Sequence, residues 1–312
     1  MSNKGYSKSK NADIFFKALT VLCASLVFAV MLGTLIALTK NSALSIKQFG
    51  LKFLVSLNWN PVTGEFGALS SIFGTLVSTA IALILAVPLS LVIALFLSEL
   101  APPSLSKPVG YAIELLAAIP SIIYGMWGLF VFAPFVSKYV QPALGKVLGF
   151  MPLFKGPPMG IGMLTAGIIL ALMILPFISA VMREVFQMVP AMVKESGYGM
   201  GATTWEVTRK VTIRYGLVGL LGATFLGLGR AIGETMAVTF VIGNEHGISA
   251  SLFSASNSIA STLANEFAEA AEPLYLSSLM ELGLVLFLIT FVVQIIAQLW
   301  LKRVKRATGV GL

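Results

Sequence analysis

The sequence predicts an all-α integral membrane protein with six transmembrane helices and with both termini in the cytoplasm. Of its 312 residues, 57% are hydrophobic and only 11% are charged, whereas a soluble domain carries about a quarter charged residues. Apolar stretches long enough to cross a bilayer recur along the chain. The basic residues gather in alternate connections between these stretches, which is the distribution that the positive-inside rule gives to a multi-pass protein.

The first span is predicted at residues 14–38, an apolar stretch interrupted only by Lys17. It follows Lys4, Lys8 and Lys10, so the beginning of the chain resembles a secretory signal peptide. The stretch is longer than the apolar region of a signal peptide, and no convincing small-residue cleavage site follows it. We therefore expect a retained first helix, which forms an N-terminal region with the tail and an external loop at residues 1–67.

Five further spans are predicted in a membrane core at residues 68–301, and a basic tail follows at 302–312. The five spans are expected at 69–97, 111–133, 160–181, 217–243 and 275–301. Pro88, Pro120 and Pro176 fall inside spans, where neighbouring helices can satisfy the carbonyl groups that a kink sets free. Such kinks occur both in helices that line a pathway and in ordinary packed bundles. No internal repeat is evident, so the signature of many secondary transporters is not visible.

The distribution of lysine and arginine gives the orientation. The tails and connections predicted to be cytoplasmic contain 13 of these residues, whereas the connections on the other side contain 6. The 244–274 connection, on the external side, contains four glutamates and no basic residue. The cytoplasmic set includes a long loop at 183–216. The net charge of +8 is therefore explained by topology, and no nucleic acid is required as a partner.

Several kinds of chemistry are excluded by what the chain contains. Its one cysteine, Cys23, lies in an apolar run and offers neither a disulfide nor a metal cluster. No phosphate-binding GxxxxGK[ST] loop occurs, and the glycine-rich stretch 227–233 lies inside an apolar span. We therefore expect no enzyme activity and no cofactor in this chain, and any ATP hydrolysis must take place in a partner. The only histidine, His246, is expected to be a solvated loop residue.

The cytoplasmic loop is predicted to form a helix, a glycine turn and a second helix at residues 190–214, which we call the knob. Pro190 suits the first turn of a helix that would continue to about Tyr198. Gly199 and Gly201 can supply the positive φ that ends a helix. Thr203 and Glu206 have the spacing of a capping box at the start of the second helix. A rigid knob can transmit force between a partner and the membrane spans.

The knob resembles the EAA loop of ABC-importer permeases. That motif reads Glu-Ala-Ala, three residues, Gly, nine residues, then Ile-x-Leu-Pro, and here it corresponds to Glu195, Ser196, Gly197 and Gly201. Small residues replace both alanines, and Arg214 stands where the family has its final proline. The resemblance implies a loop that docks into a groove of an ATP-hydrolysing subunit. The alternative is a loop that only connects two spans.

A charged pair is predicted at the middle of the fifth span. An arginine at the bilayer centre costs about 2.5–3.5 kcal/mol on insertion scales, so Arg230 must face a partner or a watery path. Glu234 follows one helical turn later, on the same face. A guanidinium matches the tetrahedral oxygens of phosphate, so Arg230 is a candidate for contact with an anion in transit. The alternative is a structural pair that only neutralises itself.

Two further features accompany this pair. Gly229 and Gly233 form a GxxxG step, which allows another helix to approach closely; it suits a subunit interface or tight packing within the chain equally well. Glu281 lies about two turns into the last span, where it either lines the substrate pathway or forms a local hydrogen bond.

Longer stretches resemble the PstC-type permease subunits of high-affinity phosphate ABC importers. They lie at residues 114–130, 228–240 and 263–270, and the similarity extends from the second span to the last. It implies a type I importer permease architecture and phosphate transport across the bacterial inner membrane by alternating access. The implied partners are a sister permease subunit, an ATPase dimer that holds ATP and Mg²⁺, and an external phosphate-binding protein. In that family the Arg-x-x-x-Glu step of this span matters for phosphate passage, and it corresponds to Arg230 and Glu234.

Two other functions remain as alternatives. One is a secondary anion transporter driven by an ion gradient, with Arg230 and Glu234 as its coupled pair, which would transport without any ATPase. The other is a membrane scaffold or sensor that does not itself transport.

Overall fold

The computed structural model describes residues 4–308, with side-chain surroundings for residues 12–306. The long helices are α1 (Lys4–Asn41), α4 (Leu69–Leu95), α5 (Pro103–Ala117), α9 (Met163–Gln187), α12 (Ile213–Ile232) and α15 (Pro273–Thr308). In the described range there is no β-strand, and extended pairing is limited to two isolated bridges. Six helical stretches there are long and apolar enough to cross a membrane. The predicted all-α, six-span fold is confirmed.

The shorter elements connect these helices at the two ends of the bundle. They are α2 (Ala43–Phe49), α3 (Lys52–Val55), η1 (Phe96–Leu100), α6 (Ser121–Trp127), η2 (Gly128–Phe132), α7 (Ala133–Phe135), η3 (Val136–Val140), α8 (Gln141–Leu148), η4 (Pro152–Phe154), α10 (Ala191–Gly199), α11 (Thr204–Val207), η5 (Thr208–Thr212), α13 (Met236–Thr239) and α14 (Ile259–Glu266). Those labelled η are 3-10 or π turns, and most of them continue a neighbouring α-helix.

Helix α9 forms the centre of the bundle, with α4, α5 and α12 packed around it. It is the most buried of the six candidate spans. Small residues let the helices approach closely: a side chain at Gly167 of α9 would meet Ile81 of α4, and one at Gly227 of α12 would meet Ile178 of α9. Close packing of small residues holds helices together in lipid, where no hydrophobic driving force acts between them.

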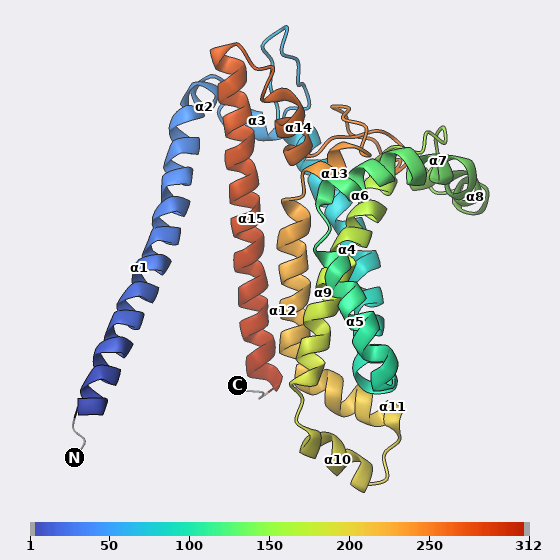
Figure 1. The fold of residues 1–312 in the computed structure, drawn as a ribbon. Helices are drawn as coiled ribbons and strands as arrows, with labels where there is room; N and C mark the ends of the chain where they lie inside the picture. The colour runs from blue at the N-terminus through green and yellow to red at the C-terminus, as the bar shows by residue number, and fades with distance from the viewer. Residues whose placement is uncertain (1–3, 309–312) are drawn as a thin grey trace.

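Two ends of the bundle can be distinguished (Figure 1). At the knob end, α1 begins, α15 ends, and α10 and α11 project beyond the other helices. At the loop end lie α2, α3, α13 and α14. Helix α1 stands apart from the bundle along most of its length and meets α15 and α2 near the loop end. The beginning of α1, the end of α15 and the knob therefore share one end, as the six-span arrangement requires.

The third predicted span, at 111–133, is not one helix, and the stretch of this region that is long and apolar enough to cross a membrane is Ser121–Leu148. Helix α5 ends at Ala117, and α6 begins at Ser121 after a break. Pro120 occupies the position just before α6 in an extended conformation, because proline lacks the N–H that would continue a helix. The hydroxyl of Tyr124 donates to the Leu116 carbonyl at 3.0 Å, so a side chain satisfies one carbonyl near the break. By contrast, α4 and α9 run without a break through Pro88 and Pro176.

The fifth predicted span, at 217–243, also ends earlier than expected. Helix α12 ends at Ile232, and the short α13 begins at Met236. Glycine is a poor helix former, and Gly233 is the residue that follows the helix. Glu234 then lies in the connection, where its Oε1 accepts a hydrogen bond from the Ala237 N–H at 3.1 Å. This carboxylate thus favours the start of a new helix over continuation of α12.

Candidate functional site

The knob has the predicted form of helix, glycine turn and helix. Helix α10 follows Pro190 directly, and Gly201 turns the chain with a φ of +83°. Gly199, in contrast, belongs to α10 and does not have a positive φ. At α11 the Thr203 hydroxyl accepts from the Glu206 N–H at 3.3 Å, and Glu206 Oε2 accepts from the Thr203 N–H at 3.1 Å. This capping box is the one that the spacing predicted.

The knob is joined firmly to the transmembrane bundle. Lys194 Nζ lies 2.6 Å from Oε1 of Glu99, which is largely buried in η1 at the end of α4. Within the knob, a Cβ at Gly197 would lie 3.0 Å from Val207 of α11, so the two short helices touch at a glycine. A force on the knob therefore reaches α4 through an ion pair and α12 through the continuous chain α11–η5–α12.

The outward side of the knob is exposed and partly apolar. Glu195 and Ser196 are exposed, as are Met192, Met200 and Trp205. Met200 keeps 83% of its surface accessible. Large exposed apolar side chains on a projecting segment suit a contact surface for another protein. Of the predicted coupling residues, Glu195 and Ser196 lie on this surface, Gly197 lies beneath it, and Gly201 shapes the turn.

Arg230 lies in the last turn of α12 rather than at the middle of a longer helix. Its side chain is exposed in the single chain, although the sequence suggested a buried position. The guanidinium carbon lies 5.5 Å from the centre of the Phe177 ring of α9, a cation–π contact. Among the described residues Arg230 forms no ion pair. The helical pair expected with Glu234 is absent there because α12 ends before Glu234, whose carboxylate caps α13 instead.

One face of α12, which carries Gly222, Leu226 and Gly229, is open. A side chain added at Gly222 or Gly229 would meet nothing within 4 Å, and Leu226 between them is exposed. This face of α12 therefore has no helix packed on it within the described chain. The GxxxG step was interpreted either as a place of tight packing within the chain or as an interface with another subunit. Gly229 does not pack within the chain, so the interface is the interpretation that is left for it.

An apolar cavity of about 510 Å³ lies between α5, α6 and α9. Tyr124, Trp127 and Pro176 are among the residues that line it. Arg230 is not among the residues that line it, and its cation–π partner Phe177 follows the lining residue Pro176 in the sequence of α9.

Glu281 is only 6% exposed in α15 and lies close to the buried Ser45 of α2. Its Oε2 atom is buried and lacks a hydrogen-bond partner in the described part of the chain. The place of Glu281 in a substrate pathway stays a prediction.

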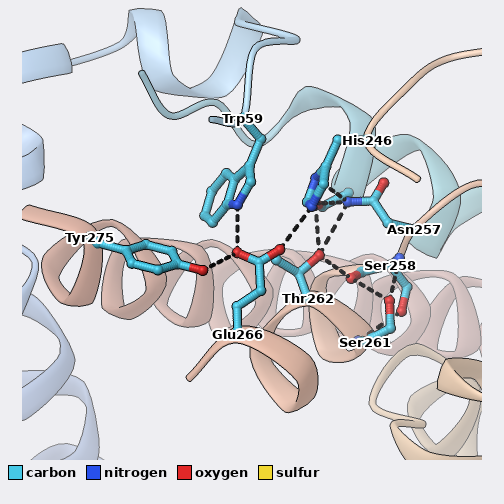
Figure 2. A network of polar contacts seen from close by, with 9 residues as sticks. Trp59, His246, Asn257, Ser258, Ser261, Thr262, Glu266 and Tyr275 are labelled. Atoms are coloured by element: carbon cyan, nitrogen blue, oxygen red, sulfur yellow. Dashed lines mark hydrogen bonds and ion pairs between the residues drawn. The ribbon is translucent and has the colours of Figure 1, made fainter. Parts of the chain in front are cut away.

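His246 is not a solvated loop residue, contrary to the expectation from sequence. Figure 2 shows it in a polar network at the loop end, where its Nε2 lies 2.9 Å from Glu266 Oε1 and its ring stacks on Trp59. The other carboxylate oxygen of Glu266 accepts from Trp59 Nε1 at 2.6 Å and from the Tyr275 hydroxyl at 2.7 Å. Asn257 lies 2.9 Å from the second ring nitrogen of His246.

This network joins segments that are distant in sequence. It connects the loop before α4, the connection between α13 and α14, α14 itself and the start of α15. Burial would raise the pKa of Glu266, but the hydrogen bonds from His246, Tyr275 and Trp59 together outweigh it and hold that pKa below its ordinary value. No local sequence pattern could have revealed this cluster, because Trp59 and Glu266 meet only in the fold. The one available signal was a lone histidine in an acidic loop.

No group of three or more potential metal ligands occurs among the described residues.

Comparison with known proteins identifies relatives over most of the chain. Residues 86–306 match the family described as "Binding-protein-dependent transport system inner membrane component". The "Phosphate transport system permease protein PstC" of Mesorhizobium japonicum is 53% identical over 95% of this chain and 92% of its own. That of Haemophilus influenzae is 53% identical over 95% of each chain. The "Probable phosphate transport system permease protein PstC" of Methanocaldococcus jannaschii is 35% identical over 92% of this chain and 93% of its own.

A structural relative has the same fold at low sequence identity. It is a chain of the MetNI methionine ABC transporter in an inward-facing conformation, with a TM-score of 0.52 and 17% identity. The match covers 76% of this chain and 94% of that one.

Proposed function

The chain belongs to the family of binding-protein-dependent transport system inner membrane components, and from this we propose that it is the permease subunit through which an ABC importer moves inorganic phosphate into a bacterial cell. It is a multi-pass membrane protein that works with a separate ATPase subunit. The observation that carries the choice of phosphate is the 53% identity, over 95% of the chain, to proteins named as phosphate permeases. The site supports this choice because its one exposed guanidinium suits a tetrahedral anion.

The two ends of the bundle correspond to the two sides of the bacterial inner membrane. The knob end faces the cytoplasm, because the connections at that end carry most of the lysines and arginines. The exposed face around Met192, Met200 and Trp205 docks on one subunit of an ATPase dimer, which binds the ATP and Mg²⁺. The loop end receives phosphate from an external binding protein. The open face of α12 meets a sister permease subunit.

Phosphate passes between the two permease subunits beside Arg230. A cation–π contact contributes about 0.5–2 kcal/mol, which holds the guanidinium in place without preventing its transfer to an anion. Phosphate oxygens accept hydrogen bonds from the guanidinium N–H groups while the contact with the Phe177 ring weakens. When the anion leaves, the guanidinium returns to the ring. Conduction needs such favourable but releasable binding. Glu234 acts by holding the break between α12 and α13 beside this position.

ATP-driven closure of the ATPase dimer reaches this site through the knob. The Lys194–Glu99 ion pair carries the motion to α4, and the continuous α11–η5–α12 segment carries it towards Arg230. A transporter driven by an ion gradient would not need an exposed apolar knob, so this feature favours the ABC importer over the gradient-driven alternative.

The test is phosphate uptake by proteoliposomes that contain the full complex, with and without ATP and the binding protein. We expect uptake that requires both, and we expect Arg230→Gln to abolish it while the complex still assembles. Arg303→Gln, which removes another exposed guanidinium from the end of α15, is the matched control and should retain uptake. Normal phosphate uptake by the Arg230→Gln complex would contradict the assigned role, and uptake without ATP would contradict the proposed class.

A further inference from the structure

Residues 133–150 form a lateral arm at the loop end, made of α7, η3 and α8, which extends sideways from the bundle (Figure 1). The chain has already crossed the bundle when it enters the arm. Helices α5 and α6 both pack on α9 and lead from the knob end to the loop end (Figure 1). The stretch Ser121–Leu148 is long and apolar enough to cross a membrane, but α7 and α8 at its far end turn sideways from the bundle instead of running along it (Figure 1). The arm is therefore free to lie along the membrane surface.

One side of the arm is fixed to the protein. Gln141 is only 1% exposed, and its Oε1 accepts the Gly160 N–H at 2.9 Å. The Ser137 hydroxyl donates to the Pro158 carbonyl at 2.5 Å. Ala133 and Val136 are buried on the same side. The arm is thus held against the segment that leads directly into α9.

The other side of the arm carries a row of aromatic rings. Ring centres are 5.5 Å apart between Trp127 and Phe132, 6.3 Å between Phe132 and Phe135, and 5.4 Å between Phe135 and Tyr139. Phe135 and Tyr139 are exposed, and Phe150 at the end of the arm keeps 77% of its surface accessible. Nothing in the described chain covers this row.

The arm and the residues just after it are positively charged. Lys138 and Lys146 on the arm and Lys155 just after it are exposed, and Lys138 Nζ lies 5.3 Å from the centre of the Tyr139 ring. The sequence between Glu114 and Glu184 contains no aspartate or glutamate. These lysines therefore have no acidic neighbour in their own segment, and they present a net positive charge beside exposed rings.

We propose that this arm is an interfacial anchor that rests in the head-group region at the loop end and binds anionic phospholipid. Aromatic side chains are enriched at that depth, and lysines there keep their stems in apolar surroundings while their ammonium groups reach the lipid phosphates. The lateral direction of the arm places its rings at the level where α9 begins. The Lys155 carbonyl accepts a hydrogen bond from the Ser251 hydroxyl, so the anchored arm also steadies the connection between α13 and α14.

The depth of a label on the arm tests this proposal. Cys23→Ser removes the only cysteine, and a fluorophore is then placed through Val147→Cys on the arm or Val62→Cys on the loop before α4, where Val62 is 94% exposed. The full chain, alone and in the assembled complex, is placed in nanodiscs of phosphatidylethanolamine and phosphatidylglycerol or of phosphatidylcholine alone. We expect the label at 147 to be quenched by head-group nitroxide lipids and protected from an aqueous quencher, and the label at 62 to behave in the opposite way.

A matched pair of triple variants separates charge on the arm from charge elsewhere. Replacing Lys138, Lys146 and Lys155 with glutamine should abolish the difference between the two lipid compositions. Replacing Lys40, Lys47 and Lys52, three exposed lysines at the same end outside the arm, should preserve it. The proposal is overturned if the label at 147 is as open to the aqueous quencher as the label at 62. It is equally overturned if protection occurs only in the assembled complex, which would assign the arm to a protein partner.

Discussion

The contact between Arg230 and Phe177 bears on how strongly an anion would bind in the proposed pathway. The ring lies against the guanidinium, so in that proposal ring and phosphate compete for the same cation. A contact of this kind is worth about 0.5–2 kcal/mol. The absence of an ion pair to Glu234 fits this view, because a close carboxylate would neutralise the guanidinium and weaken its attraction for an anion far more.

We predict that Phe177→Leu strengthens phosphate binding and slows its release. Loss of about 0.5–2 kcal/mol of competing interaction corresponds to about a twofold to thirtyfold change in affinity. The phosphate concentration that half-saturates uptake by the assembled complex should fall, together with the maximal rate. Phe177→Tyr keeps an aromatic face and should behave as the parent protein does. A weaker apparent affinity in Phe177→Leu would show that the ring positions Arg230 for phosphate and does not compete with it.

The Glu266 carboxylate makes the loop end sensitive to acid. Its pKa in the folded protein is lowered, since the hydrogen bonds of the network outweigh the effect of burial. A lowered pKa contributes stability that is complete above the ordinary value of 4.5 and is lost as the pH falls through the folded value. The thermal unfolding midpoint of the complex should therefore fall more steeply below that pH in the parent protein than in Glu266→Gln.

Glu266→Gln should also be less stable than the parent at neutral pH, because Trp59, Tyr275 and His246 lose a charged acceptor. Glu245→Gln, in the exposed part of the same connection, is the control and should retain the parent's acid sensitivity. Equal acid sensitivity in Glu266→Gln and the parent protein would remove Glu266 as the source of the effect.

At the scale of elements, the turn of the knob depends on one glycine. Gly201 has a φ of +83° and has open space around it, whereas Gly199 has the same open space without a positive φ. A side chain at Gly201 would therefore be strained by backbone conformation alone, by about 1–3 kcal/mol. Gly201→Val should weaken binding of the ATPase subunit in a pull-down assay, while Gly199→Ala should preserve it. If Gly201→Val bound the ATPase subunit as well as the parent does, the turn of the knob would not determine the ATPase contact, and the prediction would be wrong.

The ion pair between α10 and η1 should couple the knob to the bundle. Lys194 and Glu99 are largely shielded from solvent, so either residue without its partner leaves a poorly solvated charge. Lys194→Gln should allow the ATPase to bind but should lower phosphate uptake per ATP hydrolysed. Lys210→Gln breaks an exposed pair with Glu206 and should have little effect. Unchanged coupling in Lys194→Gln would leave the continuous α11–η5–α12 path as the sole mechanical connection.

The elements differ in how well the sequence predicted them. Hydropathy predicted six spans, although the third and fifth have other bounds in the structure, Ser121–Leu148 and Thr204–Ile232. Capping and glycine rules located the knob, because these signals are local. The breaks after Ala117 and Ile232 were missed: each falls inside an apolar run, and hydropathy does not distinguish a continuous helix from two short ones. Pro120 and Gly233 lie at the two breaks. Prolines alone do not predict such breaks, because Pro88 and Pro176 lie in helices that continue through them.

At the scale of the whole molecule, the single chain leaves surfaces that only an assembly can cover. The polar network at the loop end and the environment of Arg230 depend on segments that meet only in the fold, so neither could be located from sequence. The open face of α12 is a further case, because its glycines lie in the same apolar helix as those that pack inside the chain. Only the structure separates Gly227, which meets Ile178, from Gly229, which meets nothing within 4 Å.

This difference predicts opposite defects for two neighbouring substitutions. Gly227→Leu should prevent the chain itself from folding, since even a Cβ there would lie 2.5 Å from Ile178 and overpacking is strongly destabilising. Gly229→Leu should leave the thermal stability of the isolated chain in detergent unchanged, and it should block co-purification with the sister permease because it fills a face that the partner helix needs. Gly229→Ala, which adds one methyl group, should assemble partially. If Gly229→Leu assembled normally, the partner would have to lie on another face of α12, and Arg230 would then face lipid, where an unpaired guanidinium is too costly to persist.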